Sequence, residues 1–515
     1  MAHEGTTKQH EPKRMSGWDF ATWRAASADP AMRSTIMGVM VLDRAPDWNR
    51  LRDRYERASR LVPILRTKVV EGPVAIANPR LVIDPGFDLD FHLMRFKMPA
   101  GSGWKEVLNE ARRQSMSDFD RDRPLWMVTL LEGLPGGKSV LLSKLHHAVA
   151  DGQAALQLGA VLVDLTPEGY DLGPMPPVPE PEHLNQIEFA ETMVHDNVDW
   201  VAQKAAEIIR GAIPHAAQFL AAPREKVHEL IAAATSIMRF AQTPMEALSP
   251  VAAKRSINYH FATFDVPFAE LRDAAKASGN SLNDAFMAAV AFGMGGYHEV
   301  MGSPVDKLNV SMPISLRKAC EIGKNAVNIA RFDLPTAIPD PHLLMEAIGE
   351  QVKAWRAEPA LGFADQFAEI SRFVPHELVT AAAKASDVTA SNVPGPPIPV
   401  WLAGAKVERM YPLPPTIGAA VFVALLSYDG NASIGLALDD AAISDQPALV
   451  KSMIAGFGKI IGKPLVEADP LAVPAEKKAP AAKKAPAAKK APAARKAPAA
   501  RKAPAARKAP AARTD

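Results

Sequence analysis

The sequence predicts a mixed α and β protein built from two domains and followed by a disordered tail. A chain of 515 residues is too long for one ordinary hydrophobic core, so two domains are the default expectation. Short apolar runs typical of strands alternate along the chain with longer segments of helical spacing. From residue 477 onward the pattern changes to repeats of a charged six-residue unit. These observations separate a folded body from a tail.

The first domain is expected at residues 15–165. Apolar and β-branched runs indicate its strands, and apolar residues three or four positions apart indicate its helices. In chain order the pattern predicts a strand at 35–42, a helix at 48–61, a helix at 104–119, a hairpin at 129–145 around Leu134-Pro135-Gly136-Gly137, and an apolar helix at 153–165.

Residues 166–255 are expected to connect the domains as a linker and a helical crossing segment. Prolines between residues 174 and 181 mark the linker, and residues 183–247 read as several helices with breaks at Pro214 and Pro223. Packing on the core is the commoner outcome for apolar helix faces of this kind. A membrane-facing or lid surface is the alternative.

The second domain is expected at residues 256–466. In chain order the pattern predicts a helix at 283–299, strands at 308–312, 417–427 and 432–438, and a helix at 447–461. The glycine-rich run at 293–296 lies inside the first of these helices and follows no strand. It therefore does not have the context of a dinucleotide-binding loop.

The tail, residues 467–515, is expected to be disordered because each repeat contains a proline and like charges repel. From residue 477 it carries 13 Lys and Arg residues and one acid, Asp515, so the body is acidic, at −10, within a net charge of +2. Residues 477–515 are expected to contact anionic lipid or DNA without sequence readout. A solubilising appendage with no specific partner is the plainer alternative.

The composition also indicates the cellular compartment in which the protein is expected. Cys320 is the single cysteine, so no intramolecular disulfide is possible and a reducing compartment is expected. The first 14 residues lack the apolar core of a secretory signal, and no apolar run is long enough to span a membrane. No His, Cys or carboxylate cluster has the spacing of a structural metal site. The expectation is a soluble or peripheral protein without a metal.

The strongest chemical signal is His146-His147, followed by Asp151 and Gly152, directly after the apolar run at 139–145. A neutral imidazole has a pKa of about 6.5 and can accept a proton near pH 7. The aspartate can hold a ring or a nearby cation, and the glycine permits a sharp turn or a close approach to a ligand. A satisfied structural pair or half of a metal site is the plainer interpretation of two adjacent histidines.

The pattern His-His-x-x-x-Asp-Gly and its surroundings resemble the bacterial wax ester synthase/diacylglycerol acyltransferase family. The resemblance covers roughly residues 15–465, and the combination of motifs is more specific than the histidine motif alone. The further motifs are Phe87–His92, Asp122-Arg123-Pro124-Leu125-Trp126, Ser281-Leu282-Asn283-Asp284, Met312–Arg317, Asp333–Thr336, Asn392-Val393-Pro394-Gly395-Pro396 and Ser427–Gly430.

The resemblance implies a two-domain α/β fold of the chloramphenicol-acetyltransferase type with its active site at the domain interface. It also implies an acyl-CoA donor, an alcohol acceptor such as diacylglycerol or a fatty alcohol, and no further cofactor. His147 is then the general base that takes the hydroxyl proton as the alcohol attacks the thioester. His146 supports its neighbour, and Asp151 holds the loop, although a triad role for this aspartate stays open.

The secondary motifs each have a structural and a functional interpretation. Asn283 and Asp284 open a helical segment in the pattern of a capping box, while the resemblance places them at the active site and makes Asn283 a candidate to polarise the oxyanion. Pro124-Leu125-Trp126 is either a turn with a core aromatic or, by resemblance, part of the substrate channel. Asn392–Pro396 must be a constrained turn, because two prolines flank its glycine.

One segment departs from the family. Members usually begin with Ser-Pro-x-Asp, then Phe-Leu and a nearby Glu, whereas Ser16–Trp23 keeps the Ser and Asp and changes the rest. If this segment lines the acyl channel, as the resemblance implies, chain-length or acceptor preference should differ.

The function expected from the sequence is O-acylation of diacylglycerol to triacylglycerol, with wax ester formation from long-chain alcohols as a second activity. The expected location is cytoplasmic, peripheral to the inner face of the plasma membrane or to lipid inclusions. One alternative is acylation of another lipid alcohol. Another is a non-catalytic scaffold on lipid inclusions tethered by the basic tail, against which the complete histidine motif argues.

Overall fold

A computed structural model describes residues 15, 17–71, 79–147, 159, 161–181, 246–315, 327–357, 375–467 and 469–472. Residues 1–473 form one compact unit and residues 474–515 a second, and every described residue belongs to the first. The basic repeats and nearly all of the expected crossing helices at 183–247 lie outside the described residues. None of the described helices is long and apolar enough to cross a membrane.

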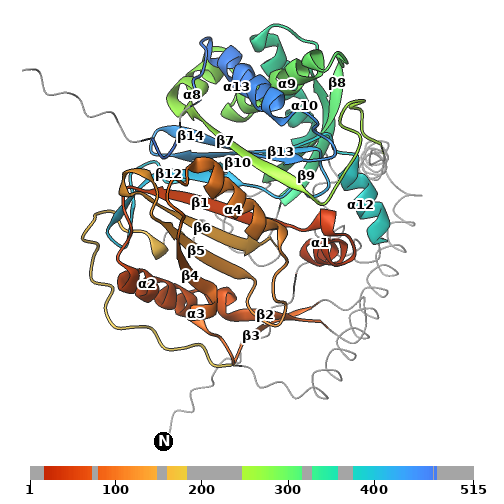
Figure 1. The fold of residues 1–515 in the computed structure, drawn as a ribbon. Coiled ribbons are helices and arrows are strands. Elements are labelled where there is room, and N and C mark those ends of the chain that lie inside the picture. Colours follow the sequence, from red (N-terminus) through yellow and green to blue (C-terminus); the bar gives the residue numbers. More distant parts are fainter. Residues whose placement is uncertain are drawn as a thin grey trace, which may run out of the picture. The chain divides into compact units, whose positions relative to one another are not determined.

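Within the described ranges the strands form two six-stranded sheets and one two-stranded sheet (Figure 1). The first sheet runs β11 (Trp401–Leu402), β12 (Ala405–Leu413), β1 (Thr35–Leu42), β6 (Ser139–His146), β5 (Trp126–Glu132) and β4 (Leu93–Lys97). The second runs β7 (Tyr259–Pro267), β14 (Asn431–Asp439), β13 (Val421–Tyr428), β10 (Val388–Pro394), β8 (Lys307–Ser315) and β9 (Val327–Pro335). β2 (Thr67–Val70) pairs with β3 (Arg80–Ile83).

Helices cover both large sheets (Figure 1). The first half contributes α1 (Gly17–Ala28), α2 (Trp48–Leu61), α3 (Leu89–His92) and α4 (Trp104–Met116), with short 3₁₀ turns at Pro30–Met32, Pro63–Arg66 and Pro135–Gly137. The second half contributes α8 (Phe268–Ala277), α9 (Leu282–Val300), α10 (Pro341–Arg356), α12 (His376–Lys384) and α13 (Gln446–Ile461). Together with the mixed sheets they confirm the predicted α/β class.

The first sheet contains two strands from the C-terminal half of the chain. β1 pairs on one side with β6 and on the other with β12, so Met37 lies opposite Leu413 in the antiparallel register. β11 and β12 therefore complete the first sheet although they come from the C-terminal half of the sequence. Apart from these two strands, the strands of the first sheet lie within the first expected domain, 15–165, and those of the second sheet lie within the second, 256–466.

A shared core joins the sheets. One cluster of buried side chains contains Val39 and Leu142 of the first sheet together with Phe261 and Phe422 of the second. α4 lies at the same cluster, and its Trp104 Nε1 donates to Thr263 Oγ1 on β7 at 2.8 Å. Each fully buried side chain of this size stabilises the fold by about 1.5–3 kcal/mol, so the cluster ties the two sheets together strongly.

The glycine-rich run of α9 is a site of close helix packing. A Cβ added at Gly456 of α13 would overlap the carbonyl oxygen of Ala289, and one added at Gly293 would press on Met453. Small residues at these positions let the two helix backbones approach each other. The run therefore belongs to a buried helix, as its sequence context predicts, and serves packing.

Four arginines of α2 hold the linker strap, which we define as residues 164–181. They are spaced so that they share one face of the helix. Their guanidinium groups donate to Asp164 (Arg50 and Arg54), to Pro167 O (Arg50), to Gly173 O (Arg57) and to Pro176 O (Arg60). Asp164 is fully buried, and its backbone also pairs with Trp401 of β11. The proline-rich linker is thus fixed to the first sheet without helix or strand structure of its own.

Two predicted boundaries are corrected by the structure. The helix expected at 104–119 ends at Met116, because Ser117 and the next residues form a turn beside β6. The folded body continues beyond residue 466: Leu471 is buried in the shared core, and Lys138 Nζ donates to Pro470 O at 3.0 Å. One apolar side chain is enough to anchor a short segment that otherwise reads as part of the tail.

Candidate active site

The histidine pair lies at the end of β6, a central strand of the first sheet. His146 is opposite Thr35 of β1, and its backbone N–H donates to Leu125 O at 3.0 Å. The backbone N–H of His147 donates to Ser34 O at 2.9 Å, and its side chain is half-buried. Neighbouring segments on both sides of β6 therefore hold the backbone of the pair in place.

His146 is buried among aromatic rings. Its imidazole meets the Trp23 indole edge-on, with the ring centroids 5.1 Å apart, and the Phe119 ring at 5.9 Å. Burial, followed by the nearby His147 and the surrounding cations, lowers the pKa of His146 to about 3. The ring is therefore neutral near pH 7, as suits a supporting residue.

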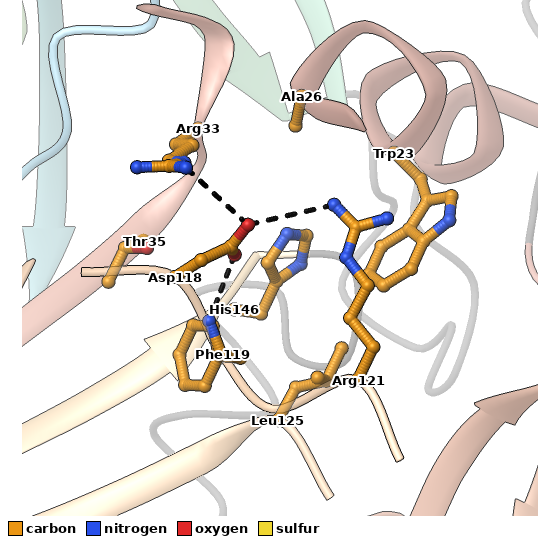
Figure 2. Close-up of a pocket in the computed structure, with 9 residues that line it drawn as sticks. All are labelled: Trp23, Ala26, Arg33, Thr35, Asp118, Phe119, Arg121, Leu125 and His146. Carbon is orange, nitrogen blue, oxygen red and sulfur yellow. Dashed lines mark hydrogen bonds and ion pairs between the residues drawn. The ribbon is translucent and has the colours of Figure 1, made fainter. Parts of the chain in front are cut away.

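A small pocket opens beside His146 (Figure 2). Its apolar walls come from α1, from the turn after α4 and from the turn before β5, and charged side chains complete it. The lining residues are Trp23, Ala26, Arg33, Thr35, Asp118, Phe119, Arg121, Leu125 and His146. Within it Asp118 Oδ2 lies 3.7 Å from Arg33 Nη2 and 3.8 Å from Arg121 Nη2. The two arginines thus share one carboxylate.

Lys144 holds the turn at 117–119, which forms one wall of this pocket. Its Nζ donates to Ser117 O at 2.9 Å and lies 4.1 Å from the centre of the Phe119 ring. Burial lowers the pKa of Lys144 to about 8. Sequence reasoning did not single out this residue, although a lysine inside an otherwise apolar central strand is the signal that could have found it.

The Pro124-Leu125-Trp126 motif forms a turn with a core aromatic and also contributes one residue to the pocket. Trp126 N donates to Pro124 O at 2.9 Å, so the three residues form a tight turn. Trp126 is a core aromatic that stacks on His92 at 4.5 Å and donates to Leu65 O. Leu125 is the member of the motif that lines the pocket beside His146.

The Asn-Asp motif lies at the start of α9. Asp284 accepts from Ser281 N at 2.8 Å and from Ser281 Oγ at 2.7 Å, so the predicted capping box is formed. Asn283 is half-buried and directs its Nδ2 toward Met312 Sδ at 3.3 Å. Neither side chain lines the pocket of Figure 2. The oxyanion role of Asn283 therefore stays a prediction.

The turn that follows β10 is constrained, as its prolines predict. Gly395 N donates to Ser427 Oγ at 3.3 Å, and a Cβ on this glycine would overlap Ser427 O. Asp151 and Gly152 lie outside the described residues, as does Cys320. Within the described ranges, no three His, Cys, Asp or Glu side chains converge in a way that could hold a metal ion.

Comparisons with known proteins match nearly the whole body. Residues 15–286 match the model of the wax ester synthase/diacylglycerol acyltransferase catalytic domain, and residues 324–460 match that of the WS/DGAT C-terminal domain. A Mycobacterium tuberculosis (strain CDC 1551 / Oshkosh) protein named a diacylglycerol O-acyltransferase is 34% identical over 438 residues, which cover 84% of this chain and 89% of the relative.

Two solved structures show the same fold. A wax ester synthase/diacylglycerol acyltransferase from Marinobacter aquaeolei VT8 aligns with a TM-score of 0.55 at 19% identity, covering 87% of this chain and 98% of that one. A starter condensation domain of rhizomide synthetase, solved with C8-CoA, aligns with a TM-score of 0.54 at 13% identity, covering 88% and 96%. The histidine pair of this chain thus sits in a fold that such proteins share.

Proposed function

The chain belongs to the wax ester synthase/diacylglycerol acyltransferase family and is an acyltransferase, and we propose that it transfers a long-chain acyl group from acyl-CoA to diacylglycerol. The observation that carries the proposal is the histidine pair held at the end of β6 beside a small pocket lined by both apolar and charged side chains. Long-chain alcohols are a second acceptor class, supported by the wax ester synthase name of the matched family.

His147 is the proposed general base of this reaction. It takes the proton of the acceptor hydroxyl as the alcohol oxygen attacks the thioester carbonyl, and a tetrahedral intermediate forms. The carbon–sulfur bond then breaks, and the imidazolium returns its proton to the departing CoA sulfur. No acyl-enzyme is needed, because the alcohol attacks the donor directly.

His146 has the supporting role in this proposal. Its buried ring is neutral near pH 7 and is packed against Trp23 and Phe119, so it cannot turn without disturbing the pocket. This packing fixes the strand end from which His147 acts. Positioning of reacting groups accounts for a large part of enzymatic rate enhancement.

The direct test incubates the purified full-length chain with radiolabelled long-chain acyl-CoA and a panel of acceptors. The panel contains diacylglycerol, long-chain alcohols and a glycolipid alcohol, and both CoA release and the labelled ester are measured. We expect triacylglycerol as the main product and a smaller yield of wax ester. Absence of CoA release with every acceptor would overturn the enzymatic proposal.

The basic tail is proposed to bring the acidic body to an anionic surface. Deleting residues 477–515 removes a charge of +12 and should abolish most binding to anionic vesicles at low salt. Thermal stability and transfer to soluble short-chain substrates should stay nearly unchanged, because the repeats lack the large apolar side chains needed to pack against a core. Vesicle co-sedimentation and thermal unfolding measure the two quantities.

Salt and DNA provide the controls for this experiment. Binding of the full-length chain should fall steeply as salt rises, because exposed charges are screened beyond about 8 Å at physiological ionic strength. DNA should compete for the same tail in a salt-dependent way. Equal vesicle binding by the full-length and truncated proteins would assign membrane attachment to the body instead.

A further inference from the structure

We propose that the hydroxyl of Ser34 donates a hydrogen bond to the thioester carbonyl oxygen as this oxygen becomes negatively charged during acyl transfer. The inference deepens the proposed function and rests on it. Ser34 directly precedes β1 and lies opposite His147, the proposed general base. Its side chain is fully buried, and its Oγ has no hydrogen-bond partner among the described residues.

The antiparallel pairing of β1 and β6 places Ser34 beside His147. Thr35 is opposite His146, so the next position along each chain is Ser34 on one side and His147 on the other. The backbone continues this register, because His147 N donates to Ser34 O at 2.9 Å. Side chains at directly opposed positions lie on the same face, with Cβ atoms about 4.5–5.5 Å apart. A group that reacts at the His147 ring is therefore within reach of the Ser34 hydroxyl.

A buried hydroxyl without a partner is unfavourable for folding. Its hydrogen bonds to water are lost when the chain folds, whereas an alanine of nearly the same shape avoids that loss. Two further hydroxyls of the described residues are in the same situation, those of Tyr297 on α9 and Thr380 on α12. Ser34 differs from them by its place opposite the base. That place gives its hydroxyl a partner that is present only during the reaction.

The chemistry of the transfer supplies this partner. As the alcohol oxygen adds to the thioester carbonyl and His147 takes its proton, the carbonyl oxygen becomes negatively charged. The O–H of Ser34 donates to this oxygen, and no proton leaves the serine. When the carbon–sulfur bond breaks, the carbonyl re-forms and the hydrogen bond weakens. A hydrogen-bond donor in a site that excludes water stabilises such a charge strongly, because it is already oriented and replaces no solvent.

The backbone of Ser34 is fixed on both sides. Before it, Arg33 Nη1 donates to Met116 O at 3.0 Å. After it, Thr35 enters the ladder of β1 opposite His146. Only rotation about the Cα–Cβ bond is then needed to direct the hydroxyl, among its three staggered positions, toward the substrate. A hydrogen-bond donor whose backbone is set in advance is what stabilisation of an oxyanion requires.

The test replaces Ser34 by Ala in the full-length chain and measures acyl transfer and thermal unfolding on the same preparation. Both kcat and kcat/KM should fall by about 10²–10³-fold, the loss typical of one hydrogen-bond donor to an oxyanion. The Kd for CoA, measured by isothermal titration calorimetry, should stay within about twofold, because the hydrogen bond forms only in the transition state. The melting temperature should be unchanged or higher, since the unpaired hydroxyl is gone.

Ser139→Ala is the matched control on the same pair of strands. Ser139 begins β6 opposite Leu42, at the other end of the pairing, and is also fully buried. Its Oγ donates to Arg44 O at 2.8 Å. Ser139→Ala should therefore lower the melting temperature and leave the transfer rate unchanged. The two serine variants thus have opposite expected results, which a general disturbance of the strands cannot produce.

The outcomes separate this inference from the function on which it rests. With an active wild type, a folded Ser34→Ala enzyme of wild-type kcat would overturn the role of Ser34 and leave the proposed function intact. Loss of rate in Asn283→Ala but not in Ser34→Ala would do the same and assign the oxyanion to Asn283. If Ser34→Ala does not fold, Ser34→Cys decides: its weak S–H donor should give a reduced rate, and a wild-type rate would overturn the role. A wild-type enzyme without transfer to any acceptor would overturn both proposals.

Discussion

Replacing His147 by Ala is expected to lower the rate of acyl transfer by about 10²–10⁴-fold, the usual contribution of a general base. The loss should appear in kcat and in kcat/KM together, because the base acts in the transition state and not in the binding of acyl-CoA. Steady-state kinetics with a thiol reagent for released CoA measures the rate. Thermal unfolding should show a folded protein, since His147 is half-buried and lies just beyond the strand.

His146→Ala is the comparison that fixes the roles of the two rings. This variant should lose less of the transfer rate than His147→Ala does and more of the free energy of unfolding, because His146 is 6% exposed and packs against Trp23 and Phe119. A stable His147→Ala enzyme with near-normal turnover, alongside an inactive His146→Ala enzyme, would reverse the assignment.

Asp164→Ala is expected to lower the free energy of unfolding by about 3–5 kcal/mol, the usual cost of removing one partner of a buried ion pair. Asp164 is fully buried and accepts from Arg50 and Arg54, and the second of these arginines is itself only 4% exposed. Without the carboxylate, the Arg54 charge stays buried and uncompensated. The start of the linker strap also loses its side-chain anchor. Urea unfolding of the wild type and the variant measures the difference.

Asp90→Ala provides the matched control, because its arginine partner lies on α2 like the partners of Asp164. Asp90 pairs with Arg52 of α2 at 2.7 Å, but the two side chains are 68% and 40% exposed. An exposed pair of this kind contributes about 0–1 kcal/mol, so this variant should unfold nearly as the wild type does. Equal losses for the two variants would show that burial of Asp164 adds nothing to the strength of its pairs.

The elements that the sequence predicts well are those with local signals. The helix at Trp48–Leu61 has its predicted bounds because Asp47 caps its first turn and apolar residues follow at helical spacing. The strand at Thr35–Leu42 is likewise a continuous apolar run. The pairing of β1 with β12 could not be predicted in this way. A strand carries no local mark of a partner that is hundreds of residues distant.

The same contrast holds at the candidate active site. The sequence motif identifies His146 and His147, because two imidazoles after an apolar strand are rare enough to stand out. The pocket walls come instead from separate elements, and Asp118, Arg121 and Arg33 read in the sequence as ordinary charged residues of turns. Only the fold shows that the two arginines share the one carboxylate beside His146.

β12 is translated long after its partner β1, and this delay affects how the chain folds during synthesis. β1 can pair with β6 once residue 146 has been made, but its other edge stays unpaired until Ala405–Leu413 has been made. At about 5–20 residues per second, this edge stays open on the ribosome for on the order of tens of seconds. An open apolar edge strand is a template for pairing with other chains. We therefore expect a nonsense mutation upstream of residue 405 to yield aggregated protein, not a partly active fragment, even though the histidine pair has already been translated.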